Sequence, residues 1–214
     1  MRIQHFLISE HGLKYTVLLN TVELTDHKMS LNQLFTILEE LQTKYPTAII
    51  QFFNSDYVLN EDHLYHAIYF VQKAFKYGQH ISQKASIEFL LYLSTNRQIK
   101  KAIEAFGISA SDLNEKLLDY CIVANGDEEV NKINTDLLTN FSCIEKQSPY
   151  IQESEEKYNR LLSYFGFSTN QIKTRLNSLE VKRFERIEVP LKDAIRLHAL
   201  EDLIIEKMAL LSLE

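Results

Sequence analysis

Two histidines in the first half of the chain have a spacing that could hold a metal ion. His63 and His66 are three residues apart in a segment with a helical pattern, so both imidazoles would project from one face. A metal site needs a third ligand and, in an enzyme, usually a carboxylate nearby. Glu61 and Asp62 precede the pair, but acids in the first turn of a helix complement its dipole. We therefore expect no metal here, and a metal-dependent enzyme that uses His63 and His66 is kept as an alternative.

Motifs for nucleophilic catalysis and for phosphate binding are missing from the sequence. The chain contains no GxSxG elbow, no GxGxxG fingerprint and no GxxxxGK[ST] loop. Its two cysteines, Cys121 and Cys143, belong to no CxxC pair, which favours buried free thiols over a disulfide or a zinc site. The sequence therefore predicts no catalytic residue and no cofactor, and it favours a protein that is not an enzyme.

Basic residues gather in one part of an otherwise acidic chain. Residues 73–104 contain four more cations than anions, whereas the whole chain has a formal net charge of −6. The six cations are Lys73, Lys76, Lys84, Arg97, Lys100 and Lys101. Such charge segregation can form a phosphate-binding surface, beside which aromatic side chains stack on unpaired bases. Lysines at the C-terminal end of a helix also neutralise its dipole, which explains Lys73 and Lys76 but not Arg97 at a helix start. Composition alone leaves both interpretations open.

Length and composition are ordinary for a soluble globular protein. The chain has 214 residues, 45% hydrophobic and 24% charged, and a single domain over residues 1–214 fits this length. We find no run of 18 apolar residues and no signal-peptide pattern. We therefore expect no membrane span and a cytoplasmic location, or also a nuclear one if the source is a eukaryote. The net charge argues against a globally basic nucleic-acid binder.

Hydrophobic periodicity and helix caps predict an α+β fold, with a small, mostly antiparallel sheet covered by many helices and a helical C-terminal elaboration. The expected strands are residues 2–8, 14–20, 47–53, 120–124 and 181–189. The expected helices are residues 30–44, 60–78, 86–93, 97–106, 127–140, 153–165, 168–178 and 191–213. Residues 144–157 are polar and contain Pro149, so we expect a loop or linker there.

Four stretches of the sequence resemble the small regulatory subunit of the KEOPS (EKC) complex, the family of PRPK-binding proteins. They are residues 63–67 (HLxxA), 87–94 (IEFLLYLS), 97–103 (RQIxxAI, followed by Gly107) and 204–211 (IIEKMALL). The apolar segment 87–94 and the RQI segment occur together at fixed spacing, which makes the match fairly specific.

The resemblance implies a non-catalytic subunit with two kinds of partner. Members of the family bind and stimulate the small atypical kinase/ATPase of the complex. They also help to present tRNA to the neighbouring transferase subunit, which makes threonylcarbamoyladenosine (t6A), and they bind the single-stranded 3′ CCA end of tRNA directly. Carried onto this chain, the RNA-binding residues are Lys84, Arg97, Gln98 and Ile99, with Lys101 as an auxiliary. Cations contact phosphates, whereas an amide and an apolar side chain contact splayed bases.

The C-terminal part of the chain departs from the family pattern. Residues 140–190 are longer than the resemblance implies, so we expect a lineage-specific insertion there. For the kinase contact we choose the terminal helix, with Leu203, Ile204, Lys207 and Met208 as candidates. The same apolar stripe is also typical of a helix that packs into its own core. A protein-interaction module that binds the kinase and has no RNA role is a further alternative.

Overall fold

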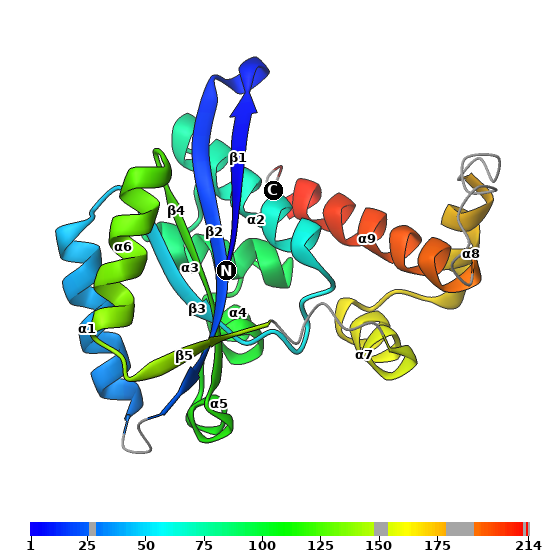
Figure 1. Ribbon diagram of the computed structural model, residues 1–214. Helices are drawn as coiled ribbons and strands as arrows, with labels where there is room; N and C mark the ends of the chain where they lie inside the picture. Colours follow the sequence, from blue (N-terminus) through cyan, green and yellow to red (C-terminus); the bar gives the residue numbers. More distant parts are fainter. Residues whose placement is uncertain (26–28, 148–153, 179–190, 212, 214) are drawn as a thin grey trace.

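The computed structural model describes residues 1–25, 29–147, 154–178, 191–211 and 213. Within these residues, five strands form one antiparallel sheet (Figure 1). They are β1 (Arg2–Ile8), β2 (Leu13–Leu24), β3 (Ile49–Phe53), β4 (Leu117–Ala124) and β5 (Cys143–Lys146). The strand order is β1-β2-β4-β3, and β5 pairs with the far end of the long strand β2.

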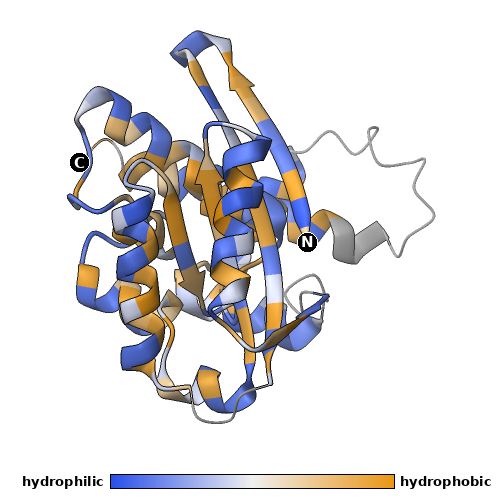
Figure 2. Ribbon diagram, turned by 60° about the vertical axis from the view of Figure 1, so that its left-hand side comes forward, coloured by the Kyte–Doolittle hydropathy of each residue, from blue (hydrophilic) through white to orange (hydrophobic). Residues whose placement is uncertain are grey.

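Both faces of the sheet are buried, because neighbouring residues of the central strands enter two different cores. Val17 of β2 and Cys121 of β4 belong to one core, whereas the adjacent Leu18 and Ile122 belong to the other. This is the alternation expected of a strand, whose successive side chains point to opposite faces. The central strands are accordingly mostly hydrophobic in Figure 2.

One face of the sheet is covered by α1 (Leu31–Lys44) and α6 (Asp127–Thr139), which lie side by side (Figure 1). The short α5 (Ala110–Glu115) precedes β4. The other face is covered by α2 (Glu61–Tyr77), α3 (Ala85–Ser94), α4 (Ile99–Phe106) and α9 (Leu191–Leu211). The helices α7 (Glu155–Phe165) and α8 (Thr169–Ser178) also contribute to this second core. The predicted α+β class is confirmed.

Helix ends follow the capping residues of the sequence. The Ser30 side chain accepts a hydrogen bond from the backbone N–H of Gln33, whose side chain accepts one from the N–H of Ser30, so a capping box starts α1. The Asn60 side chain caps α2, and Gly78 ends that helix with φ +66°, in the left-handed region that glycine adopts without strain.

Several boundaries differ from the prediction. The N-cap residue of α3 is Lys84 rather than Ser86, and it makes no side-chain capping bond. The stretch expected to be a loop begins with β5, which pairs with β2. Helix α5 was not expected from the sequence, although a capping box between Ser109 and Asp112 starts it. The strand predicted at residues 181–189 lies outside the described residues.

Candidate RNA and partner interface

The turn between α3 and α4 presents three consecutive predicted RNA-binding residues. Helix α3 is buried from Glu88 to Ser94 and ends at Thr95, which adopts a left-handed φ of 49°. Arg97, Gln98 and Ile99 follow, and all three are exposed. A buried helix therefore precedes an exposed turn that carries a cation, an amide and an aliphatic side chain.

Helix α4 extends this surface. Its inner side chains, Ala102 and Phe106, are fully buried, whereas Ile99 and Ile103 are 43% and 42% exposed. Lys101 is exposed as well, and no described acidic residue forms an ion pair with it. The structure thus brings Lys101 close to the turn in the same short helix.

Lys84 stands apart from the other predicted RNA-binding residues. It lies at the N-terminal end of α3, whereas Arg97 follows the C-terminal end. A ten-residue helix is about 15 Å long, so the two cations are separated by roughly that length. An RNA that contacts both must run along α3 over more than one nucleotide.

The loop before Lys84 is held by a buried carboxylate. Glu88 is 0% exposed and accepts hydrogen bonds from the backbone N–H groups of Ile81 and Ser82, at 3.0 and 2.7 Å. Hydrogen bonds to an ionised acceptor are stronger than those between neutral groups. Glu88 therefore acts as an anchor for the loop rather than as a charge that opposes the basic surface.

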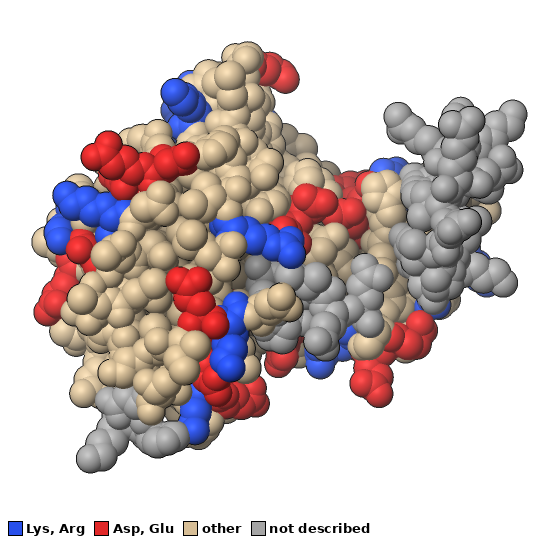
Figure 3. All heavy atoms as spheres, in the orientation of Figure 1, with Lys and Arg blue, Asp and Glu red and all other residues tan. Residues whose placement is uncertain are grey.

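Most cations of the basic segment have individual neighbours rather than one shared anion site. Lys76 donates to the carbonyl oxygens of His11 and Gly12, and Lys100 lies 3.8 Å from Glu104 in an exposed ion pair. Lys73 lies over the ring of Tyr69, with Nζ 5.9 Å from the ring centroid. On the face drawn in Figure 3, Lys and Arg side chains are interspersed with Asp and Glu and form no continuous basic surface. The predicted RNA contacts therefore consist of separate positions rather than one basic surface.

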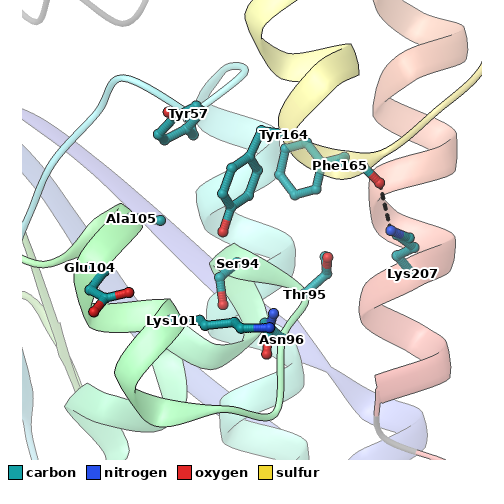
Figure 4. A pocket seen from close by; sticks show the side chains of 10 residues that line it. All are labelled: Tyr57, Ser94, Thr95, Asn96, Lys101, Glu104, Ala105, Tyr164, Phe165 and Lys207. Atoms are coloured by element: carbon teal, nitrogen blue, oxygen red, sulfur yellow. Dashed lines mark hydrogen bonds between the residues drawn. The ribbon is translucent and has the colours of Figure 1, made fainter.

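The two sets of predicted contact residues meet in one pocket. It has a volume of about 390 Å³ and lies between the α3–α4 turn, α7 and α9. Lys101, from the RNA set, and Lys207, from the kinase set, both line it, together with Asn96 and Tyr164 (Figure 4). Tyr164 stacks on Tyr57 with ring centroids 4.3 Å apart. The predicted RNA and kinase surfaces are therefore adjacent.

Only some of the predicted kinase-contact residues of α9 are accessible at the surface. Ile204 and Met208 are 1% and 0% exposed and belong to the core. Leu203 is half-buried and Lys207 is exposed. The Lys207 ammonium donates to the carbonyl oxygen of Phe165 at 2.6 Å, and partial desolvation lowers the pKa of Lys207. Of the four predicted kinase-contact residues, only Leu203 and Lys207 are therefore accessible to a partner without a rearrangement of α9.

Exposed apolar side chains that the sequence analysis did not select lie at the end of α9. Leu210 is 51% exposed and Leu213 is 80% exposed. The guanidinium Nη1 of Arg97 donates to the carbonyl oxygen of Leu211 at 3.0 Å, so this end of α9 reaches the α3–α4 turn. The spacing of Ile99 and Ile103 is a sequence signal for an outward apolar pair on α4. The contact between Arg97 and Leu211 has no such signal, because it joins positions 114 residues apart.

The histidine pair is engaged with the backbone. His63 is 1% exposed, its Nδ1 accepts a hydrogen bond from the N–H of Leu59, and its Nε2 donates one to the carbonyl of Leu93. The ring of His66 donates to the carbonyl oxygen of Asp62 at 2.8 Å. Both nitrogens of His63 are therefore occupied. Among the described residues, no cluster of three or more His, Cys, Asp or Glu side chains could hold a metal ion.

The cysteines are free thiols, with different environments. Cys121 is fully buried in β4, and desolvation raises the pKa of its thiol. We expected Cys143 to be buried, but it is half-buried, because β5 lies at the sheet edge. Desolvation also raises the pKa of the Cys143 thiol. A raised thiol pKa disfavours the reactive thiolate.

Together, the fold and the site define an α+β protein in which the exposed turn after α3 lies against the end of α9. No helix in the described part of the chain is both long and apolar enough to cross a bilayer. A comparison with curated proteins gives no match. The family model described as kinase binding protein CGI-121 matches residues 28–212, and the chain belongs to this family of kinase-binding proteins. The family is the one that the sequence resembles, the small regulatory subunit of the KEOPS complex.

Proposed function

We propose that this chain is the non-catalytic regulatory subunit of a KEOPS complex. It binds and stimulates the small atypical kinase/ATPase and recruits tRNA by its 3′ CCA end for t6A formation by the transferase subunit. Membership of the kinase-binding family supports the kinase part of the proposal. The observation that carries the RNA part is the exposure of Arg97, Gln98 and Ile99 in the turn after α3.

These three side chains match the chemistry of a single-stranded RNA end. Arg97 supplies a guanidinium for a phosphate, Gln98 supplies an amide for a base edge, and Ile99 supplies an apolar surface against a base. Lys101 adds a second cation beside the turn and Lys84 adds a third at the other end of α3. A few cations are sufficient for measurable RNA affinity, because each contact with a phosphate releases counterions and so favours binding.

The kinase surface in this proposal is the exposed side of the C-terminal half of α9. Lys207 is exposed and Leu203 is half-buried, and Leu210 and Leu213 add exposed apolar area near the helix end. The fully buried core of a protein interface is more apolar than the rest of the protein surface. Ile204 and Met208 contribute by fixing α9 on the core.

The RNA part is tested by charge reversal. Arg97→Glu and Lys84→Glu should each weaken tRNA binding at least several-fold and lower the slope of log affinity against log salt by about 1 or more. Lys132→Glu is the matched control, because Lys132 is an exposed lysine of α6, which covers the opposite face of the sheet. Unchanged binding in both Arg97→Glu and Lys84→Glu would remove the assigned RNA surface.

The kinase part is tested at Leu210. Leu210→Asp should reduce affinity for the kinase subunit and stimulation of its ATPase by about tenfold, since it places a charge in an apolar interface. Leu7→Asp is the control, because Leu7 is 75% exposed on β1. Equal kinase binding by wild type and Leu210→Asp would place the kinase elsewhere. Kinase binding by wild type without any tRNA binding would leave a protein-interaction module with no RNA role.

A further inference from the structure

Arg97 belongs to both proposed surfaces at once. Its side chain is part of the exposed turn for RNA, and its Nη1 donates a hydrogen bond to the carbonyl of Leu211. Leu211 is the last residue of α9, and its side chain is 6% exposed in the core. One guanidinium therefore connects the RNA turn to the end of the helix proposed for kinase binding.

The contact stabilises the last turn of α9 for two reasons. The final carbonyl groups of a helix have no N–H partner within the helix, and a donor from elsewhere satisfies one of them. A cation at the C-terminal end of a helix also interacts favourably with its dipole. The end of α9, with Leu210 exposed beside it, is held in place partly by Arg97.

The hydrogen bond leaves most of the guanidinium available. Arginine has five N–H donors, and Nη1 uses one of them on Leu211. No hydrogen bond to a described residue engages Nε or Nη2 of Arg97. This Nε–Nη2 edge has the fork geometry that binds a phosphate with two parallel hydrogen bonds. Arg97 can hold an RNA phosphate and the Leu211 carbonyl simultaneously.

We propose that Arg97 couples RNA binding to kinase binding. A phosphate on the Nε–Nη2 edge fixes the guanidinium on the Leu211 carbonyl and so orders the end of α9 that contacts the kinase. The coupling is favourable, and linkage requires it to be reciprocal: RNA tightens kinase binding by the same factor by which the kinase tightens RNA binding. This inference rests on the proposed function, because it needs both partners.

The first experiment measures kinase affinity with and without saturating tRNA. Wild type should bind the kinase about fivefold more tightly with tRNA, the equivalent of one hydrogen bond of ordinary strength. Arg97→Lys should lose this increase even at saturating tRNA, because one ammonium lacks the two edges of a guanidinium. Lys101→Ala is the matched control: it weakens RNA binding but leaves the contact between Arg97 and Leu211, so the increase should persist once tRNA saturates.

The second experiment excludes a direct contact between tRNA and kinase as the cause. Without kinase, tRNA should slow hydrogen exchange of the backbone amides of residues 208–211 several-fold in wild type and not in Arg97→Lys. If wild type binds no tRNA, the proposed RNA function is wrong. If wild type binds tRNA and exchange at the end of α9 is unchanged or faster, the coupling is wrong and the proposed function stands.

Discussion

Nε2 of His63 lies 3.2 Å from the carbonyl oxygen of Leu93 and joins the first turn of α2 to the last turn of α3. This hydrogen bond is buried and precedes the turn at Thr95 by two residues. His63 belongs to a motif of the family resemblance, and in the structure its hydrogen bond holds the end of the helix that precedes the turn proposed to bind RNA.

The protonation of His63 predicts how stability depends on pH. Burial lowers the pKa of His63 from 6.5 to about 3. The unfolded chain therefore binds the proton below pH 6.5 and the folded chain does not, so stability is complete above that pH and falls as the pH drops toward 3. Between neutral pH and about pH 5, wild type should lose about 2 kcal/mol through this group.

Urea titrations at several pH values measure this loss. The control is His63→Gln, whose side chain retains a donor and an acceptor but does not titrate. Its stability should fall less steeply with acid. Equal slopes for wild type and His63→Gln would show that His63 is not the titrating group.

Truncation of two residues near the end of α9, Met208 and Leu210, should lower stability to very different extents. Met208→Ala should lower the free energy of unfolding by about 2–5 kcal/mol, because Met208 is fully buried. Leu210→Ala should change it by less than about 0.5 kcal/mol, because Leu210 is half exposed. Denaturant midpoints give both values. A Met208→Ala variant with the unfolding free energy of wild type would contradict the assignment of Met208 to the core.

The buried carboxylate of Glu88 should matter for stability and for the position of Lys84. Glu88→Ala leaves the N–H groups of Ile81 and Ser82 without their acceptor and should cost about 2 kcal/mol. Glu88→Gln retains one amide oxygen and should cost less. Thermal melts show which of the two variants is the more stable. If Glu88→Ala is as stable as wild type, the loop is held by other contacts.

The fold was predictable where a local signal determines it. Ser30 and Asn60 start their helices with a side-chain hydrogen bond, and Gly78 ends its helix with a left-handed φ. These boundaries depend on the residue itself, so they can be predicted from the sequence. The strand β5 was missed, because it is only four residues long and mostly exposed, and because its conformation depends on pairing with β2. Pairing partners far away in the chain leave no local pattern.

The candidate site was predictable in its residue types but not in its connections. The sequence placed Arg97 at the start of a helix, whereas in the structure α4 begins at Ile99 and Arg97 lies in the turn before it. The carbonyl of Leu211 as the partner of Arg97 follows only from tertiary structure. Likewise, the periodicity of α9 identifies an apolar stripe but does not determine which residues enter the core. The structure places Ile204 and Met208 inside and leaves Lys207 at the pocket that Lys101 also lines.

The proposed recruitment of tRNA is tested most directly by a filter-binding titration of the wild-type protein at two salt concentrations, with intact tRNA compared with tRNA lacking its 3′ CCA end. We predict that intact tRNA binds tightly, that removing the CCA end weakens binding at least tenfold, and that affinity falls steeply with salt. Weak binding that is the same for intact and trimmed tRNA would contradict this account.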